Sequence, residues 1–114
     1  MINARLARLI LWVEDPHGLS DWYCETFGWT ETVRAVDEGW IELDAGGFTL
    51  ALHGGTTLKP RRWPKLQVAV DDVAAQRTRL LRAGIRMSKI HKWQHLEWSE
   101  CSDPEGNTVQ ICNR

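Results

Sequence analysis

Apolar and polar positions along the chain predict a strand and a helix, followed by three more strands. Residues 6–13 form a nearly continuous apolar run, which is typical of a buried strand. Pro16 comes soon after it, and a proline in the first turn favours a helix that runs to about Phe27 and ends at Gly28. Turns rich in glycine and aspartate divide the next stretch into three predicted strands, at residues 29–34, 40–43 and 48–53.

The same series of elements starts again after a basic link that contains two prolines. Residues 66–72 predict a strand that ends in a pair of aspartates, and either aspartate can cap a following helix. That helix is predicted over residues 73–83 and ends at Gly84, which lies 56 residues after Gly28. Three strands follow, predicted over residues 85–93, 95–102 and 107–112. The chain is therefore interpreted as an internal repeat.

This repeat predicts an α+β fold of two tandem βαβββ modules. A chain of 114 residues is long enough to bury one core without disulfides or a structural metal, so we expect a single domain. The predicted boundaries are about 5–55 for the first module, 56–63 for the linker and 64–113 for the second module, all within one domain of residues 1–114.

Composition and charge argue against several classes of partner. The chain is 43% hydrophobic and 25% charged, with a formal net charge of -1. Nucleic acids and anionic membranes attract proteins with a broad excess of positive charge, so neither is expected as a partner. The charge is nevertheless divided unevenly, because residues 1–57 carry three basic and nine acidic residues, whereas residues 58–114 carry 11 and six. The two halves are electrostatic complements.

The cysteines and the apolar stretches indicate a cytoplasmic protein. Cys24, Cys101 and Cys112 are an odd number without a CxxC pair, which favours reduced thiols over a disulfide framework. The first residues lack the apolar run of a signal peptide, and no stretch reaches the roughly 18 apolar residues of a membrane span.

Seven tryptophans accompany only one tyrosine and two phenylalanines. A buried indole needs space for its rings and a partner for its N–H group. The excess therefore predicts either an unusually bulky core or a surface on which flat ligands stack.

Four segments, taken together and in this order, resemble the vicinal oxygen chelate superfamily, which includes glyoxalase I, extradiol dioxygenases, fosfomycin resistance enzymes and bleomycin resistance proteins. They are Leu-Trp-Val-Glu-Asp at residues 11–15, the aromatic and glycine positions of residues 22–29, Val-Ala-Val-Asp-Asp-Val at residues 68–73 and Asp-Pro-Glu-Gly-Asn at residues 103–107. The resemblance implies that the two modules form a cupped mixed sheet around a cleft, with the helices outside.

The resemblance also implies four metal ligands, and the corresponding positions of this chain hold Arg8, Ala51, Lys65 and Gln110. A divalent ion binds neutral imidazole or carboxylate, and two cations beside it would repel it. We therefore expect no metal, no other cofactor and no catalytic residue. Without metal, the reactions of the family lose their Lewis acid.

Strand alternation, anchored at these positions, predicts which side chains line the cleft. The candidate ligand-binding residues are Arg8, Trp12, Trp40, Glu42, His53, Lys65, Gln67, Trp98, Glu100 and Gln110. Two alternatives stay open for the cations, since each can pair with Glu42 or Glu100, or each can recognise an anion. The three tryptophans can be core or can stack on a flat ligand.

The leading hypothesis is a metal-free protein, similar to the bleomycin resistance branch, that sequesters a flat aromatic or charged small molecule. One alternative is a glyoxalase- or dioxygenase-like metalloenzyme that has rebuilt its site from His53, Glu42, Glu100 and Gln110. Another is a structural or regulatory domain whose cleft is filled by its own side chains. The complementary halves and the resemblance together predict a homodimer.

Overall fold

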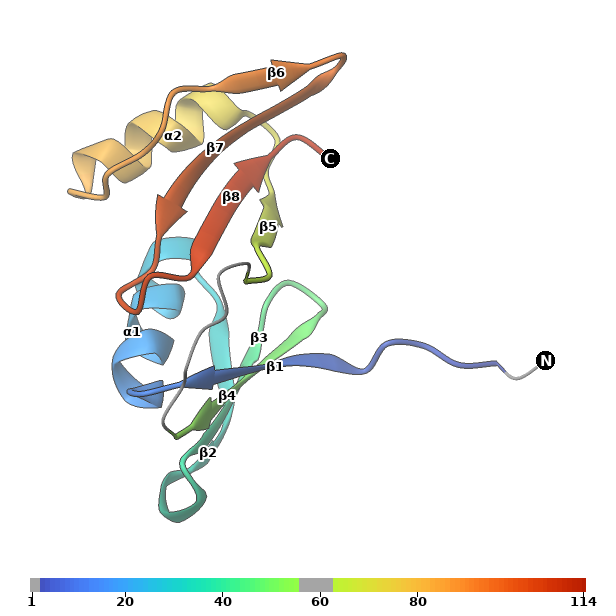
Figure 1. Ribbon diagram of the computed structural model, residues 1–114, viewed down its shortest axis with the longest axis vertical. Helices are drawn as coiled ribbons and strands as arrows, with labels where there is room; N and C mark the ends of the chain where they lie inside the picture. The colour runs from blue at the N-terminus through green and yellow to red at the C-terminus, as the bar shows by residue number, and fades with distance from the viewer. Residues whose placement is uncertain (1–2, 56–62) are drawn as a thin grey trace. The chain divides into compact units, whose positions relative to one another are not determined.

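The computed structural model describes residues 3–55 and 63–114, and the chain divides into two compact units (Figure 1). These are Met1–Leu58 and Lys59–Arg114. Within the described residues, each unit contains one α-helix and one four-stranded mixed sheet, which confirms the α+β fold with two βαβββ modules. The predicted linker, residues 56–63, lies outside the described residues except for Trp63.

The first unit has the sheet order β1-β4-β3-β2, in which β1 runs parallel to β4 and the other pairs are antiparallel. Strand β1 begins at Arg8, two residues later than predicted, because its pairing with β4 starts where Arg8 lies opposite Thr49. The elements are β1 (Arg8–Val13), α1 (Pro16–Phe27), β2 (Thr30–Ala35), the 3-10 helix η1 (Val36–Glu38), β3 (Trp40–Asp44) and β4 (Thr49–Gly54).

The second unit repeats this arrangement with the sheet order β5-β8-β7-β6, in which β5 runs parallel to β8. The parallel pair again joins the first strand of the module to the last. The elements are β5 (Leu66–Ala69), α2 (Val73–Arg82), β6 (His91–Trp93), β7 (Leu96–Ser102) and β8 (Thr108–Cys112).

The strand predicted over residues 85–93 is wrong for its first six residues, because β6 comprises only His91–Trp93. Ser88 accounts for the difference. Its backbone N–H donates to the carbonyl of Glu100, and its side-chain oxygen accepts from the Glu100 N–H. The carbonyl of Ser88 accepts from the hydroxyl of Ser99. Hydroxyl groups thus bind this segment to β7 in place of a regular ladder.

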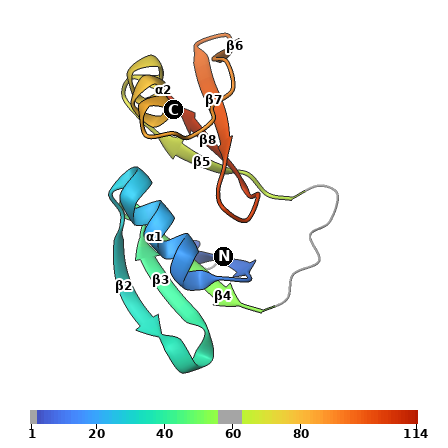
Figure 2. The same ribbon diagram turned by 90° about the vertical axis from the view of Figure 1, so that its left-hand side faces the viewer.

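Each helix covers one face of its own sheet (Figure 2). In the first unit, Leu11 and Val13 point toward the helix side and are buried together with Leu19 and Tyr23 of α1. In the second unit, the buried strand residues Val109 and Ile111 and the helix residues Val73 and Leu80 form the corresponding core. Strand alternation then places the intervening side chains on the opposite face of each sheet.

Local sequence fixes the helix ends: α1 ends at Phe27 as predicted, and α2 ends at Arg82, one residue before its predicted end at residue 83. Asp15 caps α1 by accepting a hydrogen bond from the Gly18 N–H at 3.1 Å, and Gly28 ends the helix with a φ of 71°. Asp72 caps α2 by accepting from the Ala75 N–H at 3.0 Å. Neither helix is long and apolar enough to span a membrane.

Candidate functional site

The face of the first sheet that lies opposite α1 carries a row of three rings. Strand register places Trp12, His53 and Trp40 side by side on β1, β4 and β3. The centroid of the His53 ring lies 4.0 Å from that of Trp12 and 5.6 Å from that of Trp40. Trp12 is 48% exposed, so this row presents aromatic surface to the outside of the unit. We call Trp12, His53 and Trp40 the aromatic row.

An ion pair adjoins the aromatic row. Nη1 of Arg8 lies 2.8 Å from Oε1 of Glu42, and the indole N–H of Trp40 donates to Oε2 of Glu42 at 2.8 Å. The pair spans strand β4 at Ala51, which lies opposite Glu42. Because Ala51 carries only a methyl group, it leaves room for Arg8 to reach across. Both oxygens of Glu42 therefore already accept a bond.

The second sheet carries a polar chain on its corresponding face. Oε1 of Glu100 accepts from Nζ of Lys65 at 3.0 Å and from Nε2 of Gln110 at 2.5 Å. Oε1 of Gln110 in turn accepts from Nε2 of Gln67 at 2.8 Å. Register places Gln67, Gln110 and Glu100 side by side on β5, β8 and β7. We call Lys65, Glu100, Gln110 and Gln67 the polar chain.

The pKa of Glu100 is held below its ordinary value. The hydrogen bond from Gln110 is the main cause, and the hydrogen bond and charge of Lys65 lower the pKa further, as does the charge of His91. Partial burial opposes these effects. Glu100 is therefore an anion at neutral pH, matched by the cation of Lys65.

Trp98 lies beside the polar chain and stacks on His91. Their ring centroids are 5.4 Å apart at an interplanar angle of 21°, and register places them opposite one another on β7 and β6. Sequence alternation places Trp98 among the candidate ligand-binding residues, whereas His91 is not one of them. Contact between them depends on the turn at Gln94, which adopts a positive φ of 55° and falls at the break between the strands predicted over residues 85–93 and 95–102.

The two faces share one arrangement. Glu42 and Glu100 each follow a tryptophan by two residues, and these Trp-x-Glu segments begin at Trp40 and Trp98, 58 residues apart. In each unit the glutamate holds the cation that stands at the start of the module. The units differ in the middle strand, where the first has Ala51 and the second has Gln110.

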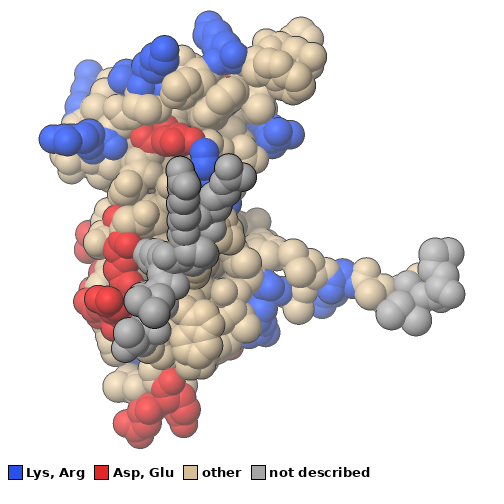
Figure 3. Space-filling view, in the orientation of Figure 1, with Lys and Arg blue, Asp and Glu red and all other residues tan. Residues whose placement is uncertain are grey.

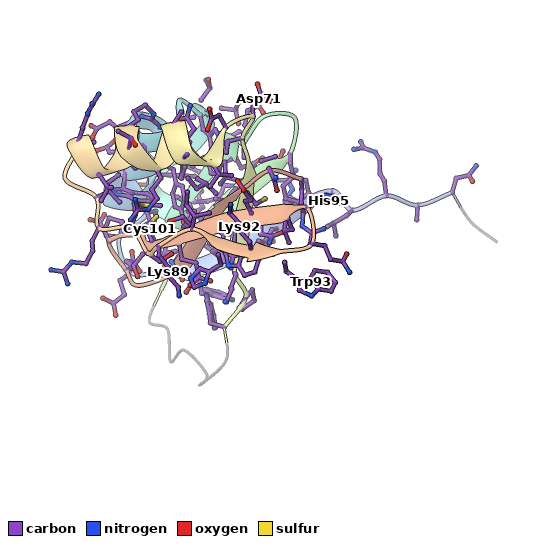
Figure 4. All side chains as sticks on the ribbon, turned by 90° about the horizontal axis from the view of Figure 1, so that it is seen from above. Asp71, Lys89, Lys92, Trp93, His95 and Cys101 are labelled. Atoms are coloured by element: carbon purple, nitrogen blue, oxygen red, sulfur yellow. The ribbon has the colours of Figure 1, made fainter. Side chains whose placement is uncertain are left out.

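Charge is divided between the units as the sequence predicts. Lys and Arg side chains are prominent on the second unit and Asp and Glu side chains on the first (Figure 3). Within the second unit, Lys92 and Trp93 stand at the β6–β7 hairpin with His95, and Trp93 is 64% exposed (Figure 4). Cys101 is buried on the helix side of the same sheet.

Comparison with protein families matches residues 8–112 to the family described as a glyoxalase-like domain. The chain belongs to the glyoxalase-like domain family. No curated protein matches it significantly in sequence. Because the family match covers β1 to β8, both the aromatic row and the polar chain lie within the glyoxalase-like domain.

Solved structures share the fold of this domain. An antibiotic binding protein, TnmS3 from Streptomyces sp. CB03234, is 23% identical with a TM-score of 0.81, over 97% of this chain and 96% of that chain. A bleomycin resistance determinant encoded on the transposon Tn5 is 20% identical with a TM-score of 0.75, over 97% and 98%. Lactoylglutathione lyase from Agrobacterium tumefaciens is 17% identical with a TM-score of 0.78, over 96% and 93%.

The residues at the expected ligand positions of this glyoxalase-like domain do not fit a divalent metal ion. Arg8 and Lys65 are cations that pair with glutamates, and Ala51 offers no side-chain atom that could bind a metal. The amide of Gln110 is already engaged, because its Nε2 donates to Glu100 and its Oε1 accepts from Gln67. The residues of the alternative, rebuilt metal site are divided between the units: Glu42 and His53 belong to the first unit, and Glu100 and Gln110 belong to the second. Within the described residues, no group of three or more His, Cys, Asp or Glu side chains could hold a metal ion.

Proposed function

We propose that this glyoxalase-like domain is a metal-free binding protein that sequesters a flat aromatic or charged small molecule without changing it. The observation that carries the proposal is the aromatic row, which places three rings on three adjacent strands beside the Arg8–Glu42 ion pair. Rings at this spacing offer dispersion and quadrupole contacts to a planar compound.

Two structural neighbours are an antibiotic binding protein and a bleomycin resistance determinant, which supports a role in antibiotic resistance through sequestration. The proposed contact residues are the aromatic row with Arg8 and Glu42, and Trp98 with the polar chain. The charged members of each face are paired with one another, so a ligand that covers either face leaves no charge there without a partner.

Calorimetric titration of the full chain against planar aromatic natural products and drugs tests the proposal. Trp12→Ala removes an exposed ring of the aromatic row, and we expect it to weaken binding about tenfold, because a stacking contact and its buried area contribute about 1.4 kcal/mol. Trp93→Ala is the matched control, since Trp93 is an exposed tryptophan outside the aromatic row. Binding by Trp93→Ala should equal that of the wild type.

Two results would contradict the proposal. One is the absence of heat and of any fluorescence change across the panel at high micromolar concentrations of ligand. The other is one tightly bound equivalent of zinc, iron, nickel or manganese, found by elemental analysis of protein purified without chelator. That second result would favour the metalloenzyme with a rebuilt site.

We also propose a cytoplasmic homodimer. The first half of the chain has three basic and nine acidic residues and the second half has 11 and six, so unlike halves of two copies can meet twice around a two-fold axis. Exposed ion pairs add little at physiological salt, so apolar contacts would supply most of the affinity and the charges mainly the pairing specificity.

A further inference from the structure

The ring of His53 is fixed in place by three contacts in the first unit. Trp12 lies against it at a centroid distance of 4.0 Å and an interplanar angle of 40°, and Trp40 meets it nearly edge-on at 87°. Nδ1 of His53 lies 3.0 Å from the carbonyl oxygen of Gly54. Ring contacts and a hydrogen bond together define the orientation of the imidazole.

The hydrogen bond to Gly54 determines where the proton of the neutral ring resides. A carbonyl oxygen can only accept a hydrogen bond, so Nδ1 of His53 must donate. A neutral imidazole carries one N–H, and its other nitrogen then holds a lone pair. Nε2 of His53 is therefore an acceptor, and it has no hydrogen-bond partner among the described residues.

The other polar groups next to this ring are already engaged. The indole N–H of Trp40 is bound to Glu42, and the second carboxylate oxygen of Glu42 accepts from Arg8. Nε2 of His53 is thus an unengaged acceptor placed between two indole rings. A planar molecule that stacks on one indole of the aromatic row can meet this nitrogen with its edge, because the His53 ring is inclined to both indoles, at 40° to Trp12 and 87° to Trp40.

We propose that His53 selects planar aromatic ligands that carry a hydrogen-bond donor on the ring edge, such as a phenolic O–H or a ring N–H. This inference rests on the proposed function, and it adds the chemical class that the site prefers. A ligand with a methylated edge would cover Nε2 and displace its solvent without offering a donor in return, which is unfavourable.

Matched ligand pairs test the inference on the full chain. The probes are 2-naphthol against 2-methoxynaphthalene and carbazole against N-methylcarbazole, measured by equilibrium dialysis or calorimetry at pH 8. We expect each donor ligand to bind about five- to tenfold more tightly than its methylated partner, which corresponds to one neutral hydrogen bond.

Two histidine variants complete this test. His53→Phe keeps a flat ring but lacks the acceptor nitrogen, and it should remove the preference for the donor ligand within each pair. His95→Phe, a change at an exposed histidine of the β6–β7 turn, should keep it.

The outcomes separate this inference from the proposed function. If both members of each pair bind the wild type equally, the role of His53 is overturned and the aromatic binding function stands. If no planar compound binds, the proposed function fails and the inference fails with it.

The tautomer of His53 gives a second test that needs no ligand, because nitrogen-15 NMR at pH 8 distinguishes the protonated from the unprotonated ring nitrogen. We expect the hydrogen on Nδ1, and a hydrogen on Nε2 would overturn the inference.

Discussion

Arg8 on β1 and Glu42 on β3 form a 2.8 Å ion pair that reaches across strand β4. Lys65 and Glu100 form a 3.0 Å ion pair in the second unit, between the start of β5 and β7. In both units a cation stands at the position that the family resemblance gives to a metal ligand, and a glutamate of the same sheet neutralises it.

A double-mutant cycle would measure the Arg8–Glu42 interaction. The side chain of Arg8 is 38% exposed and that of Glu42 is 18% exposed, so solvent screens the pair only in part. We expect Arg8→Ala to lower the free energy of unfolding by about 1 kcal/mol, with a coupling energy to Glu42→Ala of about 1 kcal/mol. Arg5→Ala is the control at an exposed position and should leave urea unfolding unchanged. A coupling energy near zero would contradict the interaction.

Acid unfolding should depend on Glu100. Its pKa in the folded protein is below the ordinary value of 4.5, so ionised Glu100 stabilises the native state. That contribution is complete above about pH 4.5 and is lost as the pH falls through the lower folded value. We therefore expect the wild type to lose more stability than Glu100→Gln between about pH 5 and pH 3, measured by denaturant unfolding at each pH. Parallel losses in the two proteins would show that Glu100 contributes nothing.

The three thiols should differ in reactivity. Burial raises the pKa of Cys101 to about 11, and the charge of Asp103 adds to the shift, so almost none of this thiol is ionised at neutral pH. Cys112 is buried, whereas Cys24 on α1 is partly exposed. We expect one equivalent of Ellman's reagent to react rapidly with the native protein, and Cys24→Ser to abolish that phase. Rapid reaction that persists in Cys24→Ser would contradict the burial of the other two thiols.

Two adjacent glycines at the end of β4 should respond differently to alanine. A Cβ atom on Gly54 would lie 3.2 Å from the carbonyl oxygen of Gly39 and 3.2 Å from Cγ of Pro16, and the backbone cannot easily yield. We expect Gly54→Ala to lower the free energy of unfolding by about 1 to 3 kcal/mol. A Cβ atom on Gly55 would lie 3.2 Å from the Trp12 ring, which can move because it is half-exposed.

Gly55→Ala should therefore change stability little but shift the indole N–H resonance of Trp12 and weaken ligand binding. The comparison of the two variants is its own control, since each adds one methyl group to the same strand end. Equal destabilisation by both substitutions would contradict the packing described for Trp12.

Light scattering at low micromolar concentration would test the homodimer. We expect about twice the chain mass of 13.1 kDa. The dimer should persist in about 0.5 M salt, where the screening length is about 4 to 5 Å, because apolar contacts supply most of its affinity. A monomer both with and without salt would exclude the dimer.

The sequence by itself determined the repeat, the order of the elements and the face on which most side chains lie. The alternation that sends Leu11 and Val13 to the helix side and leaves Trp12 on the other face is a local property of a strand. Helix ends at Asp15 and Gly28 are local as well, because the cap residue satisfies backbone groups within one turn. These features need no knowledge of distant neighbours.

The tertiary structure decided which side chains meet. Strand β4 lies between β1 and β3, and this order brings Trp12, His53 and Trp40 into one row and lets Arg8 reach Glu42. Sequence reasoning left open whether the cations pair with glutamates, because partners from 34 to 35 residues away meet only through strand order. The same dependence explains why the strand predicted over residues 85–93 is absent at residues 85–90, where the hydrogen bonds of Ser88 to β7 replace the ladder that the apolar pattern alone favoured. Contacts between distant strands depend on pairing geometry, and hydrophobic periodicity carries no record of it.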